Sequence, residues 1–435
     1  MDYRVSDYGA VGDGVTFDTA AIQRALDDCA ARGGGRVILE SGCTYLSASL
    51  HLRPHTALHL NRGSRLLASP NLDDYFRPDQ PGTGGSVSHV GTPVVGKPSY
   101  VFIYGYDAPD TAITGDGVID GNAYAFVRRV SPWYVTGDFY PRPTLIYVEK
   151  CDHSSFTGVT LKGAPFWSLH MAGCEDVLVQ SLRILNDLDI ANSDGIDVDH
   201  SRNVRILGCH VECADDCICM KNLRGNREYP HTRDVIVSDC TLVSTSAAIK
   251  IGTEGVDDFE NILVSRCIIS RSNRGLSIQI RDGGNVRNIS FTDIMIETRR
   301  FAESWWGCAE PIAITAIDRA PDNPGGSIRD VRFRNVTCVG ENGAVLWGEP
   351  GRISNVTFED VDIRLRRESR WPIDCYDLRP GASVSGLTSR KSLPIWAHGV
   401  DGLTLRHVRT QDFDGCTSND ANIDAAGCSN IRRED

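Results

Sequence analysis

The chain has 435 residues, of which 41% are hydrophobic and 23% are charged. This composition is typical of a folded protein with a large core and excludes a disordered chain. The formal net charge is −12, from 45 basic and 57 acidic residues, so neither nucleic acid nor an anionic membrane surface is expected as a partner. We interpret residues 1–435 as a single domain.

The first 30 residues lack a basic flank followed by an apolar run, and no stretch approaches 18 uncharged apolar residues. The 15 cysteines are odd in number and scattered along the chain. These features predict a cytoplasmic protein with reduced cysteines and no membrane span; if a leader was removed, the protein would be secreted.

Residues 1–50 are expected to form an N-terminal cap region. Within it, residues 19–32 carry apolar side chains at the spacing i, i+3, i+4 and i+7, which predicts a one-faced helix. These side chains are Ile22, Ala25, Leu26 and Cys29. Asp18 or Thr16 is expected to begin the helix, and glycines 33–35 to end it. Such a helix would cover the open end of a stacked sheet.

From residue 153 onward one pattern recurs: Asp or Asn, then Val or Ile, then alternating apolar positions and a second short alternating run. It begins at residues 176, 203, 234, 261, 288, 330 and 355, and in a weaker form at His153 and Gly402, so most intervals are 23–31 residues long. Two short strands per repeat at this period indicate an all-β fold, a single-stranded right-handed parallel β-helix. The two longer intervals predict loop insertions at about 299–327 and 364–400. Leucine-rich repeats have a similar period, but their leucine ladder is absent.

One region departs from the plain repeat. Asn192-Ser193-Asp194-Gly195 is followed, 21 residues after Asp194, by Asp215-Asp216-Cys217. A separation of about one coil places these carboxylates on neighbouring strands about 4.8 Å apart. Asp215 and Asp216 reach the same side only if the chain bends there. Grouped carboxylates raise one another's pKa values, and a protonated and an ionised carboxylate together perform acid–base hydrolysis of a glycosidic bond.

The alternation of side chains predicts one outward row formed by His170, Asp197, Cys219, Lys250 and Ser277, with Arg281 further along its strand. Lys250 and Arg281 would supply positive charge to an acidic cleft. Trp305 and Trp306 fall in the first long interval, where they are expected to form a wall for sugar stacking. The residues predicted to bind substrate are Asn192, Asp197, His170, Lys250, Gln279, Arg281, Trp305 and Trp306.

Cysteines 209, 240, 267 and 338 recur at one position of the repeat and are expected to stack in the core. Cys209, Cys213, Cys217 and Cys219 lie close to His210 in the sequence, but their spacing matches no zinc pattern, so neither a metal nor another cofactor is expected.

Together, the Asn192–Gly195 and Asp215–Cys217 motifs and the opening Tyr8-Gly9-Ala10-Val11-Gly12-Asp13-Gly14 resemble the polygalacturonases of glycoside hydrolase family 28. The resemblance covers nearly the whole chain. It implies inverting hydrolysis, with Asp215 as general acid and with Asp194 and Asp216 holding and deprotonating water. The substrate would be a pectic or related oligo- or polysaccharide, and the long loops favour exo action.

The chain departs from this family at two motifs. Ser246-Ala247-Ala248 stands in place of Gly-His-Gly, and Ser277-Ile278-Gln279 in place of Arg-Ile-Lys. In the family these basic residues engage the substrate carboxylate and support the catalytic site. Two alternatives remain: a β-helical polysaccharide lyase with carboxylate-bound Ca2+ and Lys250 or Arg281 as base, and a non-catalytic carbohydrate-binding β-helix.

Overall fold

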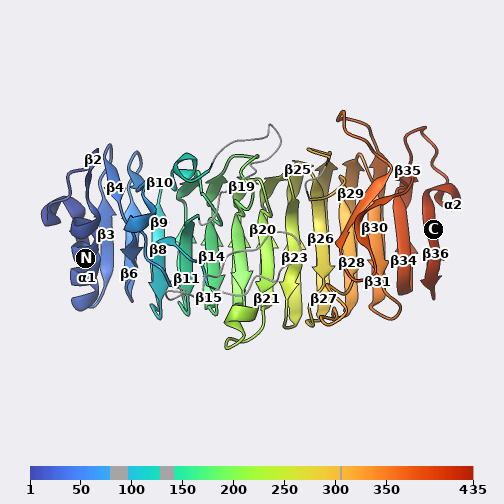
Figure 1. Ribbon diagram of the computed structural model, residues 1–435, viewed down its shortest axis with the longest axis horizontal. Coiled ribbons are helices and arrows are strands. Elements are labelled where there is room, and N and C mark those ends of the chain that lie inside the picture. Colours follow the sequence, from blue (N-terminus) through green and yellow to red (C-terminus); the bar gives the residue numbers. More distant parts are fainter. Residues whose placement is uncertain (79–96, 128–141, 304–305, 435) are drawn as a thin grey trace.

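A computed structural model describes residues 1–78, 97–127, 142–303 and 306–434. The chain winds into a right-handed parallel β-helix, with coils stacked from the N-terminal to the C-terminal end (Figure 1). Right-handed connections are the rule between parallel strands. Each coil contributes strands to three ladders, here called faces A, B and C, which follow one another in that order along the chain.

The strands of face A are β1 (Asp2–Arg4), β3 (Gly35–Leu39), β6 (Thr56–Leu60), β9 (Ala112–Gly115), β12 (Ser155–Thr157), β15 (Glu175–Gln180), β18 (Arg202–Leu207), β21 (Arg233–Ser238), β24 (Phe259–Ser265) and β37 (Arg432–Glu434). Those of face B are β2 (Asp13–Phe17), β4 (Thr44–Ser47), β7 (Arg65–Ala68), β10 (Val118–Asp120), β13 (Thr160–Lys162), β16 (Arg183–Leu185), β19 (His210–Cys213), β22 (Thr241–Ser244), β25 (Ile268–Ser272) and β35 (Arg409–Gln411).

Face C is formed by β5 (Leu50–His51), β8 (Val101–Tyr106), β11 (Thr144–Glu149), β14 (Leu169–Ala172), β17 (Ile196–Asp199), β20 (Ile218–Asn222), β23 (Ala247–Gly255), β26 (Arg274–Ile280), β28 (Ile312–Ala316), β30 (Ala344–Gly348) and β36 (Ile423–Ser429). Four longer strands turn a corner. The first three, β27 (Val286–Thr298), β29 (Ile328–Gly340) and β31 (Ile353–Leu365), run through faces A and B, and β34 (Ile395–Arg406) runs through faces C and A.

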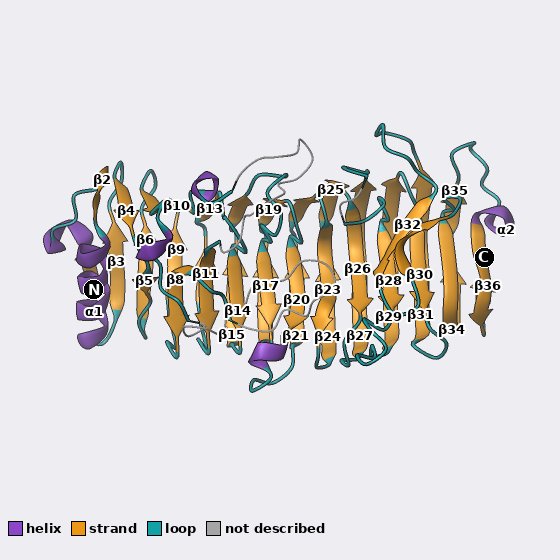
Figure 2. Ribbon diagram, in the orientation of Figure 1, coloured by secondary structure: helices purple, strands orange, loops and turns teal. Residues whose placement is uncertain are grey.

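The remaining elements lie outside the three ladders (Figure 2). Strands β32 (Cys375–Pro380) and β33 (Ser385–Ser389) form an antiparallel hairpin. The helices are α1 (Thr19–Ala31), α2 (Asn419–Asn422) and the 3-10 turns Val5–Tyr8, Leu72–Asp74, Ala123–Ala125 and Arg224–Asn226. No helix in the described part of the chain is both long and apolar enough for a membrane span.

The predicted repeat phase is confirmed by the strand register on face A. Val177, Val204, Val235, Ile262 and Ile289 pair in succession and are all buried. The polar residue before each of them adopts positive φ, as at Asp176 (58°) and Asn203 (52°). Asp and Asn tolerate this conformation better than other residues with a side chain, which explains why the repeat uses them. The predicted core cysteines 209, 240, 267 and 338 are also buried.

The predicted capping helix is confirmed as α1, which buries Ile22, Ala25, Leu26 and Cys29 against the first coils. Asp18 lies at its N-cap, but its carboxylate accepts hydrogen bonds from the backbone amides of Val11 and Gly12 instead of capping the helix. The segment 1–50 therefore contains both the cap and the first paired strands, because β1 already pairs with β3.

The two predicted insertions contain regular structure. Strand β28 lies within 299–327, so this interval is a coil with loops on either side of one strand and is not a plain loop. Interval 364–400 contains the β32–β33 hairpin and the beginning of β34. Tyr376 and Leu378 of the hairpin pack on Ala313 of β28 and Val345 of β30, so the hairpin covers the outward side of face C there.

Candidate active site

Three carboxylates meet where faces B and C join. Asp194 lies just before β17, and Asp215 and Asp216 lie in the turn between β19 and β20. This turn provides the bend that two consecutive carboxylates require to reach the same side. One oxygen from each carboxylate lies within 4.8 Å of the others. Gly195 makes the close approach possible, because a Cβ there would lie 2.4 Å from the carbonyl oxygen of Cys217.

The hydrogen bonds of the two consecutive carboxylates differ. Asp215 Oδ2 accepts a hydrogen bond from Asn192 Nδ2 at 3.1 Å. Asp216 forms an ion pair with Lys250, Nζ to Oδ2 at 2.9 Å, and accepts a hydrogen bond from Ser246 Oγ at 3.1 Å. Asp216 is therefore held as an anion, whereas Asp215 has only a neutral donor among these partners.

This difference separates their pKa values. Burial and the neighbouring charge of Asp216 raise the pKa of Asp215 to about 6, although Lys250, Lys221 and Arg379 oppose the rise. Burial would also raise the pKa of Asp216, but Lys250 and then Lys221 lower it below its usual range. A pair of carboxyl groups with separated pKa values has the form of an acid–base couple, with Asp215 protonated and Asp216 ionised.

Asp194 completes the group as a hydrogen-bonding partner. Burial, followed by the charges of Asp215 and Asp197, raises the pKa of Asp194 well above its usual range. Its Oδ1 is buried without a hydrogen-bond partner. Two oxygens closer than about 5.5 Å can share one water molecule, so Asp194 and Asp216 are spaced to hold one between them.

The outward row predicted from alternation is confirmed by the register of face C, in which His170, Asp197, Cys219, Lys250 and Ser277 pair in succession. Asp197 is buried with neither oxygen hydrogen-bonded, and its pKa is raised well above the usual range by burial, although Lys221 opposes the rise. The role of His170 as a substrate ligand stays a prediction. In the structure its Nε2 contacts Asp199, 3.2 Å from Oδ2.

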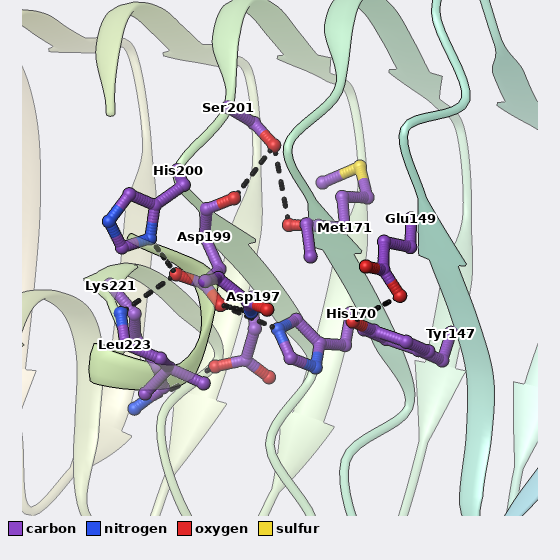
Figure 3. Close-up of polar contacts among 12 residues, drawn as sticks. Tyr147, Glu149, His170, Met171, Asp197, Asp199, His200, Ser201, Lys221 and Leu223 are labelled. Carbon is purple, nitrogen blue, oxygen red and sulfur yellow. Dashed lines mark hydrogen bonds and ion pairs between the residues drawn. The ribbon is translucent and has the colours of Figure 1, made fainter. Parts of the chain in front are cut away.

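Asp199 is the centre of a polar network beside the row (Figure 3). Its carboxylate also contacts His200 Nδ1 at 2.8 Å and accepts a hydrogen bond from the amide of Leu223 at 2.9 Å. These contacts outweigh the effect of burial and lower its pKa far below the usual range. Asp199 therefore fixes the loop after β20 and contributes a buried negative charge near Asp197.

Lys221 is a site residue that the sequence interpretation missed. Its Nζ lies 3.8 Å from Asp197 Oδ1 and 3.3 Å from Glu254 Oε2 (Figure 3 shows its position beside Asp197), and it stands 4.8 Å from the ring centroid of Trp167. The charge of Lys221 lowers the pKa of both Asp215 and Asp216. The sequence does contain a signal for Lys221. It lies two residues after Cys219, so alternation places its side chain outward, beside Asp199 on the neighbouring strand.

Strand β26 and the residue that follows it present a strip of polar side chains toward the outward side. Ser277, Gln279 and Arg281 occupy alternate positions and are all buried. The Ser277 hydroxyl, both amide atoms of Gln279, and Arg281 Nε and Nη2 have no hydrogen-bond partner. Buried polar groups are nearly always paired, so these atoms call for a ligand or ordered water.

Beyond β26 the same row becomes apolar. Ser277 pairs with Ala313, which pairs with Val345, which in turn pairs with Trp396. The hairpin packs on all three of these residues. Arg274 anchors the hairpin through ion pairs with Asp377 at 3.3 Å and with Glu310 of the first insertion at 3.1 Å. Face C is thus closed directly after β26.

The hairpin also brings in Arg379, a second residue that the sequence interpretation missed. Its guanidinium carbon lies 3.6 Å from the ring centroid of Trp306, which packs beside Ile190 and Ala191 next to Asn192. Trp306 therefore lies near Asn192, and its role as a wall for sugar stacking stays a prediction. Trp305 lies outside the described residues.

A cavity of about 740 Å3 lies between the turn that precedes Asn192 and the two insertions. It is lined by Asn186, Asp187, Leu188, Asp189, Glu212, Arg299, Arg300, Phe301, Ser369, Arg370 and Trp371. This lining combines charged groups of both signs with the aromatic rings of Phe301 and Trp371, and it does not include the three carboxylates. Asp194, Asp215 and Asp216 are also spaced as metal ligands could be, but Lys250 already provides a positive charge at Asp216.

Comparison with known proteins places these features in a family. Residues 92–380 match the model for glycosyl hydrolases family 28. Residues 3–59 match a model described as rhamnogalacturonase A/epimerase, pectate lyase-like. A probable polygalacturonase of Vitis vinifera is 29% identical over 406 residues, which cover 89% of this chain and 79% of the relative.

Two further likenesses extend the comparison. An endo-polygalacturonase of Pectobacterium carotovorum is 24% identical over 367 residues, 82% of this chain and 86% of the relative. The solved structure of a family 28 exopolygalacturonase from Yersinia enterocolitica superposes with a TM-score of 0.70 at 20% identity, over 99% of this chain and 78% of that one. This last likeness concerns the fold.

Proposed function

Because the chain belongs to glycosyl hydrolases family 28 and is a glycoside hydrolase, we propose that it cleaves pectic oligosaccharides by an inverting, exo-acting mechanism. The observation that carries the proposal is the separation of pKa values within the carboxylate group: Asp215 raised to about 6 and Asp216 lowered. Names of relatives support a pectic substrate, since they are polygalacturonases.

The proposed reaction uses the three carboxylates in distinct roles. Water held between Asp194 and Asp216 attacks the anomeric carbon, and Asp216 takes its proton. Asp215 gives its proton to the glycosidic oxygen as the carbon–oxygen bond breaks. After release of the product, Asp215 regains a proton from solvent and Asp216 loses one. Lys250 keeps Asp216 ionised before attack, and Asn192 orients the Asp215 carboxyl group.

The inverting outcome is supported by the family resemblance and by the spacing of Asp194 and Asp216, which leaves room for one water molecule between their oxygens. The closest carboxylate oxygens lie within 4.8 Å, which is shorter than the separation of about 6.5–9.5 Å common in two-carboxylate inverting sites. A third carboxylate changes that relation, because the water can sit between two acidic residues while a third protonates the leaving group.

The exo action is supported by the hairpin. Relatives include an endo-acting enzyme and a structural neighbour that is exo-acting, so their names favour neither mode. A polymer lying along face C would run into Tyr376 and Leu378 beyond β26, where they cover Ala313 and Val345. Only one end of a chain would fit next to the carboxylates.

A product assay tests the proposal. Incubation with galacturonate oligosaccharides should generate new reducing ends without the ultraviolet absorbance of an unsaturated uronate, and EDTA should have no effect. Proton NMR of the first turnovers should show the anomer opposite to that of the substrate. Absorbance that EDTA abolishes would indicate the lyase alternative, a retained anomer would contradict inversion, and binding without cleavage would indicate a carbohydrate-binding β-helix.

A further inference from the structure

The positive charges around the carboxylates differ in whether they already have partners. Lys250 is paired with Asp216, and Lys221 with Glu254 and Asp197. Arg319 forms a two-point ion pair with Asp282, through Nε at 2.8 Å and Nη2 at 2.9 Å. These three cations are therefore committed to internal carboxylates.

Arg281 is different. It is buried, two of its nitrogens have no hydrogen-bond partner, and among the described residues no carboxylate oxygen lies within ion-pair distance of its guanidinium. Burial, followed by the neighbouring guanidiniums of Arg319 and Arg379, lowers the pKa of Arg281 to about 10, although the charges of Asp282 and Glu254 oppose the shift. A buried cation without a hydrogen-bonded carboxylate is costly unless an anion binds beside it.

The location of Arg281 is the closed end of face C. A Cβ placed on Gly381, directly after β32, would lie 3.7 Å from Arg281 Nη2, so the guanidinium lies against the hairpin backbone. Two residues earlier, in β26, Gln279 offers an unpaired donor and an unpaired acceptor. Strand β26 is two coils beyond β20, about 10 Å along the axis from the Asp215–Asp216 turn.

We propose that Arg281, together with Gln279 and with Arg379 of the hairpin, binds the carboxylate and a neighbouring hydroxyl of the uronic acid unit that occupies this closed end. A carboxylate supplies the two acceptors that a guanidinium pairs with, and a sugar hydroxyl is both a donor and an acceptor, as the Gln279 amide requires. The family places its basic pair at the positions of Ser277 and Gln279, so recognition of the acidic group has moved to the residue directly after β26. The inference rests on the proposed function and makes Arg281 the determinant of specificity for an acidic sugar.

Kinetics on two substrates test this assignment. A galacturonate trisaccharide and its carboxyl-reduced counterpart are compared for the wild type, Arg281→Gln, Arg379→Gln and the exposed control Arg409→Gln, with thermal unfolding of each protein as a check on folding. Arg281→Gln should raise KM for the acidic trisaccharide about 10- to 100-fold, with kcat nearly unchanged, because a charge-assisted contact common to ground and transition states is lost. KM for the carboxyl-reduced sugar should not change, and Arg409→Gln should behave as wild type.

An unchanged KM in both Arg281→Gln and Arg379→Gln, or equal losses on the two substrates, would overturn the assignment while leaving the hydrolase intact. A wild type that cleaves neither substrate would contradict the proposed function instead. In that case, calorimetric titration with free galacturonate still decides the anion site: binding lost in Arg281→Gln supports it, and binding unaffected by the change overturns it. If Arg281→Gln does not fold, Arg379→Gln provides the same comparison.

Discussion

Lys250 Nζ lies 2.9 Å from Asp216 Oδ2, and both side chains are almost completely buried. Lys250 lies in β23, the strand on which the family's usual histidine is missing, and Asp216 is the carboxylate that is proposed to activate water. The ion pair joins these two parts of the site. The sequence predicts Lys250 as a substrate ligand, whereas this contact favours a role as the internal counter-ion of Asp216. It explains how Asp216 stays ionised beside two other carboxylates.

Lys250→Met should therefore change the pH dependence of the enzyme more than its affinity. Without the ammonium, burial and like charge raise the pKa of Asp216, so the acid limb of kcat/KM should move to higher pH. The pKa of Asp215 should rise too, because Lys250 lowers it in the wild type. Initial rates across the pH range measure both limbs, with the half-exposed Lys150→Met as control. An unshifted profile would rule out the counter-ion role.

The wild-type pH profile follows from the same two groups. Asp215 must be protonated to act as acid, so activity should fall as pH rises through about 6. Asp216 must be ionised to act as base, and since its pKa is lowered, the acid limb should lie below the usual carboxyl range. A rate that keeps rising with pH above neutrality would contradict the assignment of Asp215 as general acid.

Asp215→Asn should reduce kcat by about 10²- to 10⁴-fold, the usual contribution of a general acid, because the amide cannot donate a proton to the leaving oxygen. Removing one of three grouped acidic side chains should leave thermal stability equal to or above that of the wild type. Steady-state kinetics and a circular dichroism melt measure the two quantities. Asp401→Asn, at an exposed position of β34, is the matched control. Near-normal turnover in Asp215→Asn would move the acid role to another residue.

Arg274→Met should destabilise the protein by about 3–5 kcal/mol, since it leaves Glu310 and Asp377 as buried carboxylates without their cation. The same change should loosen the hairpin that these ion pairs hold over face C. Chemical denaturation gives the free energy of unfolding. The exposed Arg409→Met should change it by less than about 0.5 kcal/mol. Equal stabilities of the two variants would show that the hairpin is not anchored through Arg274.

Much of the fold follows from the sequence because each coil repeats the same short sequence pattern. The Asp or Asn with positive φ and the alternating apolar residues after it recur with one phase, so Val177 and Val204 could be paired before any coordinates were known. The same alternation placed Lys250 in a row with Asp197. The bend at Asp215 was required by two adjacent carboxylates reaching one side.

Other parts of the site depend on contacts that periodicity does not encode. Arg379 reaches the carboxylates only because the hairpin folds back over face C, and no repeat phase specifies that packing. The burial of Asp199 beneath His170 and His200 depends on the loop after β20. Strand β28 was hidden inside a long interval because irregular loops flank it.

The central claim, that a chain end is hydrolysed at carboxylates next to a closed face, is tested most directly by the length of the first products. Galacturonate oligomers labelled at one end, and separately at the other, are sampled during the first percent of turnover. The account predicts release of one short product of fixed length from one end, with the rest of the oligomer left as a single longer species. A spread of product lengths from internal cleavage would contradict it, because the hairpin would then not close the end of face C.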